Sequence, residues 1–370
     1  MRFTVQKEDL YNGLSAVIKA TALRGIQPVL SNVLIETINE DKIKLCATDL
    51  DISIEVKINA IIEKQGSITL PAKKLYEIIA KLPNKPVIFT LNTENNLTAI
   101  KCENSKFDLI GISASEFPSI KYPDSDESIS IDVNTLLSAV KKTVFSAATY
   151  DTNNVLSGVY FNISGEKLEM AATDGNRLSR VIENIKNTEN KEYSIVIPSK
   201  TLVEFSRIIS GSDEKTVLIT VKNGQISFKL ENKFITSRLL EGNYPKYQQL
   251  IPSNYQIVVK SDRENLIAAL DRTATMVNER TSIVKLLFTD NKLSLSADTP
   301  DLGDSEDEIE VEYKGEDLKI AFNYRYILDA LKAMDSEKIR IELGGALSSA
   351  LFKPESDEDF LNLIMPVQVK

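Results

Sequence analysis

The sequence predicts an α+β fold made of three repeated domains, each built from two βαβββ halves. A short apolar run that ends in Thr and Asp recurs as LCATD at 45–49, MAATD at 170–174 and, with its last two residues exchanged, LSADT at 295–299. The alanines of these strings are 125 residues apart in a chain of 370 residues, so the spacing predicts three copies of one unit. Within each third, the apolar period changes from two to about 3.6 and back to two.

Each repeat is predicted to open with a strand, a helix and three further strands. In the first repeat the strand is 2–5, and the helix covers about 8–22, with apolar residues at helical spacing. The three strands that follow are 29–38, 42–49 and 52–58. The same order is predicted at 128–133, 136–147, 157–163, 167–174 and 178–185 in the second repeat, and at 256–261, 264–277, 284–290, 292–298 and 308–313 in the third.

The second half of each repeat follows the same plan. The matching strings are SITLPAKKLYEIIAKL, SIVIPSKTLVEFSRII and LKIAFNYRYILDALKA, and strands such as 87–92, 97–102 and 107–113 close the half. Pro71 and Pro198 are predicted in the first helical turn, where a missing N–H costs nothing, and Asn323 is predicted as a helix N-cap. Polar joins then predict domains at 1–125, 126–252 and 253–370.

Composition excludes several classes of function. The chain has 42% hydrophobic and 26% charged residues, no apolar run near the ~20 residues of a membrane span, and no signal-peptide pattern, so we expect a cytoplasmic protein. It has no histidine, which removes Ser-His-Asp systems and His metal sites. Cys46 and Cys102 are expected to be buried thiols. Carboxylates alone can run hydrolysis, but the acidic residues are scattered or lie in one run, so we predict no enzyme and no metal or cofactor.

Positive charge is concentrated on the predicted helices although the chain as a whole carries −9. The segments 6–24, 71–82, 134–148, 198–210, 261–277 and 323–333 together carry +6, so the remainder carries −15. Lysines decorate exposed helix faces in any protein, but their recurrence favours a shared surface that faces a polyanion. The basic residues are Lys7, Lys19, Arg24, Lys73, Lys74, Lys81, Lys141, Lys142, Lys200, Arg207, Arg263, Arg272, Arg325 and Lys332.

Helix width decides how many chains a ring around nucleic acid would need. Equal repeats can close into a ring with helices lining the inside and antiparallel sheets outside. Six helices, each ~10 Å wide, leave a hole of only about 9 Å, which a duplex roughly 20 Å wide cannot enter. Twelve helices leave a hole of about 28 Å. The sequence therefore predicts a dimeric ring.

Eight strings along the whole chain resemble the bacterial sliding clamp family, the beta subunit of DNA polymerase III. They are ATDL at 47–50, LPAKKLYEI at 70–78, SASEFP at 113–118, ATDGNRLS at 172–179, IPSKTLVEF at 197–205, LEGNYPKY at 240–247, IAFNYRYILDAL at 320–331 and the ending IMPVQVK. The resemblance implies a non-catalytic homodimeric ring that encircles duplex DNA of any sequence. It also implies that the ring tethers the replicative polymerase for processive synthesis, and that a clamp loader and other proteins bind it through a short peptide.

The resemblance implies three groups of site residues. The wall of the partner-peptide pocket would be Leu156, Thr173, Gly175, Asn176, Arg177, Leu178, Pro245, Gln249, Leu250, Leu363, Met365, Pro366, Val367 and Gln368. The apolar members suit an apolar cleft, and Thr173 and Arg177 are interpreted as polar anchors. Asn176 stands where the family commonly has histidine, and Gln249 and Gln368 stand where arginine is frequent.

DNA phosphates would contact Arg24, Lys73 and Lys200, with Tyr150 on a nearby loop. The dimer seam would place Lys74, Lys106 and Phe107 of one copy against Thr275, Met276 and the acidic stretch 301–308 of the other, including Asp301, Asp304 and Asp307. A solvated acidic loop is the alternative for that stretch. The alternative for the whole chain is a repeat-built, β-rich interaction scaffold that does not encircle DNA.

Overall fold

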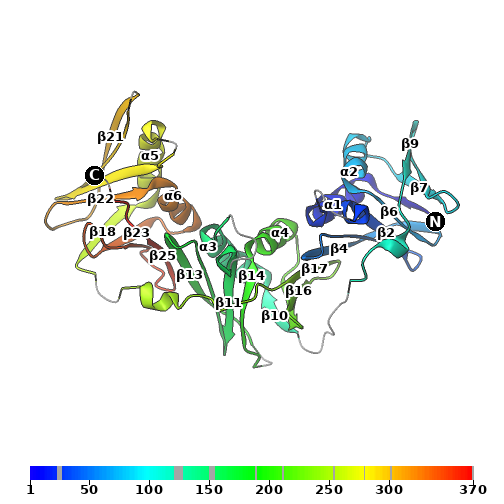
Figure 1. The fold of residues 1–370 in the computed structure, drawn as a ribbon, viewed down its shortest axis with the longest axis horizontal. Helices are drawn as coiled ribbons and strands as arrows, with labels where there is room; N and C mark the ends of the chain where they lie inside the picture. Colours follow the sequence, from blue (N-terminus) through cyan, green and yellow to red (C-terminus); the bar gives the residue numbers. More distant parts are fainter. Residues whose placement is uncertain are drawn as a thin grey trace. The chain divides into compact units, whose positions relative to one another are not determined.

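The computed structural model describes residues 1–22, 27–120, 128–149, 155–187, 190–210, 212–252, 255–278, 280–300 and 302–368 (Figure 1). Its elements follow the predicted order of two βαβββ halves in each of three repeats, which confirms the predicted α+β class. The first repeat contains β1 (Arg2–Val5), α1 (Lys7–Val17), β2 (Asn32–Ile38), β3 (Lys42–Thr48), β4 (Ile52–Asn59), β5 (Ile61–Lys64), β6 (Ser67–Pro71), α2 (Ala72–Lys81), β7 (Val87–Asn92), β8 (Leu97–Cys102) and β9 (Ser105–Ile110).

The second and third repeats lack a counterpart of β5 among the described residues. The second contains β10 (Ile129–Asp132), α3 (Val133–Thr143), β11 (Gly158–Ser164), β12 (Lys167–Thr173), β13 (Arg177–Asn184), β14 (Tyr193–Pro198), α4 (Ser199–Ile209), β15 (Thr216–Lys222), β16 (Gln225–Lys229) and β17 (Lys233–Arg238). The third contains β18 (Ile257–Asp262), α5 (Arg263–Thr273), β19 (Ile283–Thr289), β20 (Lys292–Thr299), β21 (Gly303–Glu310), β22 (Leu318–Asn323), α6 (Tyr324–Ala333), β23 (Lys338–Leu343), β24 (Ala350–Pro354) and β25 (Phe360–Ile364).

The chain forms two compact units, which divide the second repeat between them. Unit 1 comprises 1–133 and 200–239, and unit 2 comprises 134–199 and 240–370. Each unit holds one eight-stranded antiparallel sheet that runs from one repeat into the next. In unit 1 its order is β10-β15-β16-β17-β4-β3-β2-β6, and in unit 2 it is β14-β11-β12-β13-β25-β24-β23-β18. The continuous sheets therefore join neighbouring repeats through the β17–β4 and β13–β25 pairs.

Each unit also has a smaller sheet with an unpaired edge strand. The order is β5-β1-β7-β8-β9 in unit 1 and β21-β20-β19-β22 in unit 2, so β9 and β21 each end a sheet. Helices cover one face of the sheets: α1 packs on β3 and β4 beside α2, as Figure 1 shows within unit 1. The alternating apolar residues of the strands turn toward these helices and are buried.

Several element boundaries differ from the sequence-based prediction. The predicted strand 308–313 is instead β21, which begins at Gly303, because residues 303–310 pair with β20 over the full length of an antiparallel hairpin. The acidic stretch is therefore an edge strand and not a loop over its described residues 303–308. Pro71 and Pro198 end β6 and β14 and precede the helices, which corrects their predicted place in the first turn. The short strand β5 was not predicted, and it pairs with β1.

Other local predictions are confirmed, with the exception of three helix ends. The side chain of Asn323 caps α6 by accepting a hydrogen bond from the backbone N–H of Arg325. The helices predicted to end at 22, 147 and 277 change to 3-10 turns after Val17, Thr143 and Thr273. Cys46 and Cys102 are both buried free thiols, and burial raises the pKa of Cys46.

Replacing Ile235 by alanine tests how strongly the β17–β4 junction holds unit 1 together. Ile235 lies opposite Ile54, and both side chains are fully buried. We expect Ile235→Ala to lower the free energy of unfolding by about 2–5 kcal/mol, because the cavity cannot be refilled in a continuous sheet. Lys229→Ala, on an exposed position of β16, should change it by less than about 0.5 kcal/mol. Equal urea denaturation midpoints for the two variants would contradict this expectation.

Candidate partner-binding site

The turn between β12 and β13 in unit 2 is built by two side chains that bond to their own backbone. The Thr173 hydroxyl donates to the carbonyl of Arg177 at 2.6 Å and accepts from the N–H of Gly175 at 3.1 Å. The Asp174 carboxylate accepts from the N–H groups of Asn176 and Arg177 at 2.9 and 3.1 Å. Gly175 has φ of +90° with nothing within 4 Å of an added Cβ, so conformation and not space favours glycine there.

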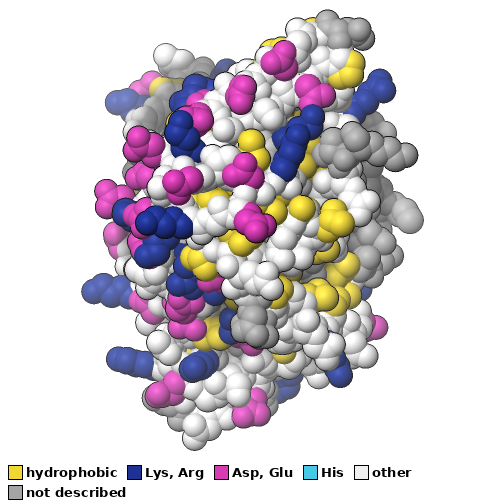
Figure 2. All heavy atoms as spheres, turned by 90° about the vertical axis from the view of Figure 1, so that its left-hand side faces the viewer, with side chains coloured by type: hydrophobic (Ala, Val, Ile, Leu, Met, Phe, Trp, Pro, Cys, Tyr) yellow, Lys and Arg dark blue, Asp and Glu magenta, His cyan; other side chains and the backbone are white. Residues whose placement is uncertain are grey.

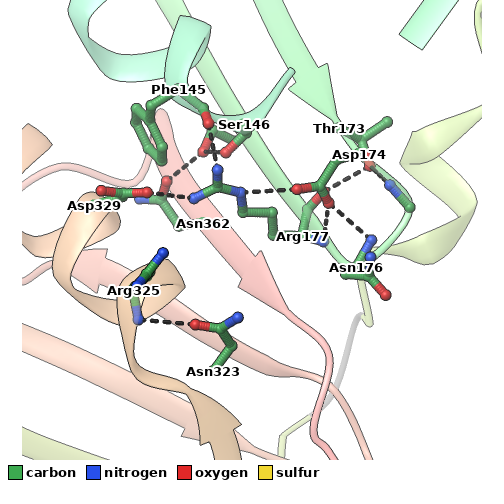
Figure 3. A network of polar contacts seen from close by, with 12 residues as sticks. Phe145, Ser146, Thr173, Asp174, Asn176, Arg177, Asn323, Arg325, Asp329 and Asn362 are labelled. Atoms are coloured by element: carbon green, nitrogen blue, oxygen red, sulfur yellow. Dashed lines mark hydrogen bonds and ion pairs between the residues drawn. The ribbon is translucent and has the colours of Figure 1, made fainter. Parts of the chain in front are cut away.

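The Arg177 guanidinium fixes this turn to two neighbouring elements (Figure 3). Nε donates to Asp174 at 3.1 Å, Nη1 to Asp329 of α6 at 2.6 Å, and Nη2 to the carbonyl of Phe145 at 2.5 Å. The guanidinium carbon also lies 4.4 Å from the ring centroid of Tyr326 and 5.6 Å from that of Phe145. The side chain is only 11% exposed. Three of its five N–H donors are thus used inside the protein.

Thr173 and Arg177 therefore shape the site through contacts inside the protein, and the interpretation of both as polar anchors for a peptide stays a prediction. The sequence reasoning missed Phe145, Tyr326 and Asp329, which hold Arg177. Tyr326 and Asp329 lie in the string IAFNYRYILDAL, from which only the resemblance to the family was predicted. Their spacing of three residues on a helix was the signal that both face one neighbour.

A buried chain of hydroxyl and amide groups lies beneath Arg177. The hydroxyl groups of Ser146 and Ser179 are 2.6 Å apart, and Ser179 donates to the side-chain carbonyl of Asn362 at 2.6 Å. The three residues come from the 3-10 turn that follows α3, from β13 and from β25, and all are at most 1% exposed. These buried hydrogen bonds connect β13, which begins at Arg177, to β25.

An apolar cluster forms the floor beside the turn. Leu178 and Leu363 are paired across β13 and β25, and both are buried. They pack in one cluster with Ala171, Tyr247, Leu351 and Leu361, bordered by Tyr160, Tyr244, Ile251 and Tyr255. The Tyr244 hydroxyl accepts from the N–H of Thr173 at 3.1 Å, and burial raises the pKa values of Tyr244 and Tyr247. The floor thus stays neutral and apolar near pH 7.

The segment after β25 continues along the same turn. The N–H of Met365 donates to the carbonyl of Asn176 at 2.9 Å, and that of Val367 donates to Ala321 at 2.8 Å. Met365 is 45% exposed, and Leu250 on the segment that follows Tyr247 is 57% exposed. Such exposure of large apolar side chains is typical of a binding surface when the side chains gather at one place.

The structure brings together most of the predicted pocket residues. The described contacts join the turn residues and Leu178 to Leu363, Met365 and the Tyr244–Tyr247 segment, which contains Pro245. Asn176, Gln249 and Gln368 are exposed and uncharged. The carbonyl of Leu156 accepts a hydrogen bond from the N–H of Ala148 at 2.8 Å. The assignment of these side chains to a pocket stays a prediction.

The residues predicted to face DNA are only partly described. Arg24 and Tyr150 lie outside the described residues. Lys73 is exposed on α2. The Lys200 ammonium is 2.7 Å from the Asp49 carboxylate, and its side chain is 58% exposed. The Asp49 carboxylate of the same unit therefore compensates part of the Lys200 charge.

The residues predicted at the dimer seam lie at or near the two edge strands. On β9, Lys106 pairs with Asp108 at 3.0 Å and Phe107 is 38% exposed, while Lys74 of α2 pairs with Glu77 at 2.7 Å. The Thr275 hydroxyl donates to the Arg272 carbonyl at 2.8 Å, and the Met276 carbonyl accepts from Thr299. Asp301 lies outside the described residues.

On β21, Asp304 is exposed, whereas Asp307 is 2.5 Å from Arg272, whose guanidinium lowers the pKa of that carboxyl. Figure 2 faces the side of unit 2 that is on the left in Figure 1, and Asp and Glu side chains are spread over it. Arg272 of the same unit thus neutralises part of the negative charge of β21.

The described residues contain neither a metal-binding cluster nor a membrane-spanning helix. No group of three or more His, Cys, Asp or Glu side chains is placed to hold a metal ion within the described ranges. No helix in this part of the chain is long and apolar enough to cross a membrane.

Comparison with known families gives one result along the whole chain. Residues 1–121, 130–246 and 248–368 match the N-terminal, central and C-terminal domain profiles of the DNA polymerase III beta subunit. A beta sliding clamp of Synechococcus elongatus is 34% identical over 376 residues, with both chains covered in full. One from Staphylococcus aureus is 32% identical, covering 100% of this chain and 99% of its own.

Solved structures give the same result. The crystal structure of the DNA polymerase sliding clamp from Bacillus subtilis has a TM-score of 0.93 and 32% identity, covering all of both chains. The DNA polymerase III beta subunit of Thermotoga maritima has a TM-score of 0.91 at 26% identity, again with full coverage.

Arg177 variants test whether the turn depends on its ion pairs. We expect Arg177→Ala to lower the free energy of unfolding by about 3 kcal/mol, because Asp174, whose side chain is 16% exposed, loses its partner. Asp329→Asn should cost less than about 1 kcal/mol, because Asp329 is 42% exposed. Chemical denaturation of both variants measures the difference. A larger cost for Asp329→Asn would contradict the assigned role of Asp174.

Proposed function

The chain belongs to the bacterial DNA polymerase III beta subunit family, the beta sliding clamps, and from this premise we propose how it works. Two copies form a closed ring around duplex DNA, and the ring tethers the replicative polymerase to its template in the cytoplasm. The family matches span the chain, and they favour this function over a scaffold that does not encircle DNA. We propose domain boundaries at 1–125, 126–252 and 253–370, close to the ends of the matched ranges.

The tether works by topology. A ring that is linked to DNA holds a weakly bound polymerase at a high effective concentration near its template without a tight contact to DNA. No step of this function breaks or forms a covalent bond, so we propose no catalytic activity and no cofactor. Opening of the ring falls to a separate clamp loader.

The sheet topology supports closure by two copies, and it is the observation that carries the proposal. The last strand of a first half, β4 or β13, pairs with the last strand of the second half of the following repeat, β17 or β25. Among the described strands, the two that lack such a partner are β21 and β9, which end their sheets. Pairing of β21 with β9 of a second copy repeats the same junction, and two such contacts close the assembly.

Side chains at these edges suit that pairing. The exposed side chains of β21 include Asp304, Glu306 and Glu308, and β9 offers Lys106 with the exposed apolar groups of Phe107 and Ile110. Lys74, Thr275 and Met276 flank the same edges in our assignment. Opposite charges steer the edges and set the register, while burial of Phe107 and Ile110 supplies affinity.

The helix layer is assigned to the DNA. Phosphate contacts from Arg24, Lys73 and Lys200, with Tyr150 nearby, would be independent of sequence, as sliding requires. The Asp49 carboxylate beside Lys200 weakens that contact, which suits a ring that must move.

The partner site is assigned to the apolar floor around Leu178 and Leu363. A peptide would place apolar side chains near Leu250 and Met365, which are exposed without it. Its polar groups would meet the uncharged side chains of Asn176, Gln249 and Gln368 and the backbone near Pro366 and Val367. The polymerase, the clamp loader and other proteins with such a peptide would compete for it.

Retention on circular DNA tests the ring. Clamps loaded on nicked circular DNA should remain bound at high salt and leave once the circle is linearised, because topology and not ionic contact holds them. Phe107→Asp should sediment as a monomer and lose retention, because it places a charge opposite the acidic edge. Asp108→Ala on the same strand serves as the matched control and should stay dimeric. Equal retention on circular and linear DNA would refute encirclement.

Substitutions at exposed apolar residues test the peptide site. Leu250→Ser combined with Met365→Ser should weaken binding of a peptide from the polymerase by roughly 30-fold or more, since two buried apolar contacts are lost. The dimer mass should not change. Leu347→Ser, which removes a still more exposed apolar group elsewhere in unit 2, should bind as the unaltered protein does. Fluorescence anisotropy measures the peptide affinity of the double variant, of Leu347→Ser and of the unaltered protein. Unchanged affinity of the double variant would show that the peptide binds elsewhere.

A further inference from the structure

The methionines of this chain differ widely in their exposure to solvent. All five lie within the described residues, and Met1, Met170 and Met334 are at most 2% exposed. Met276, in the 3-10 turn that follows α5, is partly buried. Met365, directly after β25, is 45% exposed. It is therefore the most accessible thioether among the described residues.

Other side chains that mild oxidants attack are absent or buried. The chain has no tryptophan and no histidine. Cys46 and Cys102 are each 1% exposed, and burial raises the pKa of both thiols, which leaves little reactive thiolate near pH 7. A two-electron oxidant such as a peroxide therefore meets the Met365 sulfur first.

Met365 lies beside the apolar floor that we assign to the partner peptide. The strand that precedes it pairs Leu363 with Leu178 of β13. The N–H of Met365 donates to the carbonyl of Asn176 at 2.9 Å, on the turn that borders the floor. The backbone of Met365 is thus held by the site, while its side chain is open to solvent.

The segment around Met365 offers no backbone donor to an oxygen added to the sulfur. Within the described residues 365–367, the N–H of Met365 is used by Asn176 and Pro366 has no N–H. The N–H of Val367 donates to the carbonyl of Ala321 at 2.8 Å. A sulfoxide oxygen here would lose its water under an apolar peptide side chain without a hydrogen bond from this segment in exchange, which is unfavourable.

We propose that Met365 is a redox-sensitive switch of the partner site, and this proposal rests on the partner-binding function proposed above. The oxidant is a peroxide. The sulfur lone pair attacks one peroxide oxygen, the S–O bond forms and the O–O bond breaks, and the departing oxygen takes up the proton and leaves as water. The sulfur loses two electrons and the peroxide gains them.

The product, methionine sulfoxide, is polar, so the oxidised site binds a partner peptide more weakly. The change is reversible, because methionine sulfoxide reductases return the sulfoxide to the thioether. A bound peptide covers the sulfur and protects it. The switch therefore acts on free clamps before it acts on clamps that already hold a partner.

Peroxide treatment of the full chain, followed by peptide mapping with mass spectrometry, tests which sulfur reacts. Met365 should gain oxygen at least about fivefold faster than Met170 and Met334, because their side chains are buried. Saturation with a peptide from the polymerase should slow the reaction at Met365 and leave that at Met276 unchanged, which makes Met276 the internal control. Faster oxidation of a buried methionine than of Met365 would overturn the proposal.

Fluorescence anisotropy with the same peptide measures the effect on binding. Oxidation of Met365 should lower the affinity about tenfold, and treatment with a methionine sulfoxide reductase should restore it. Each variant is compared with itself before and after peroxide. Met365→Leu should show no change on peroxide treatment, whereas Met276→Leu should show the same loss as the unaltered protein.

The outcomes separate this proposal from the function on which it rests. Unchanged affinity after complete oxidation of Met365, or a loss that Met276→Leu abolishes, would overturn the switch and leave the partner site in place. Failure of the unoxidised protein to bind the peptide would refute the partner site itself, and the switch with it.

Discussion

This fold depends on one kind of strand pairing between repeats. The last strand of the first half of one repeat pairs with the last strand of the second half of the next repeat. The β4–β17 and β13–β25 pairs make each compact unit out of parts of two repeats. Their backbone hydrogen bonds are buried between side chains such as Ile54 and Ile235, so one repeat cannot be loosened without exposing a strand edge of its neighbour. The same constraint leaves β9 and β21 unsatisfied, which is why a second copy is the natural partner.

The turn that borders the proposed partner site also occurs in the first repeat. In the first repeat Thr48 donates to the carbonyl of Ile52, and the Asp49 carboxylate accepts from two N–H groups, as their counterparts do in unit 2. Leu50 takes the left-handed position with φ of +78°, where the second repeat has glycine. Arg177 is replaced by Ile52, so no guanidinium ties that turn to a helix. The two repeats thus share the backbone turn, and they differ in the side chain that can tie it to a neighbouring helix.

Much of the fold could be predicted because it depends on local periodicity repeated three times. Six helices and the strand order follow from apolar spacing, and Asn323 follows from N-cap chemistry. The start of β21 could not be predicted, because GDSEDE lacks apolar alternation and becomes a strand only by pairing with β20. The roles of Thr173 and Arg177 were also missed. Hydrogen bonds to Asp329 and Phe145 join residues far apart in sequence, which no local pattern shows.

The same lesson applies to the positive charge of the helices. The predicted helix segments carry a net charge of +6. In the structure, however, carboxylate partners lie beside six of their cations, namely Lys74, Lys141, Lys142, Lys200, Arg207 and Arg272. Each pair reduces the field that a phosphate would meet. For a ring that slides, this is an advantage, since tight ionic contacts would hold it at one place and make its motion depend on salt. Topology can supply retention, so the helix surface needs only enough charge to tolerate DNA.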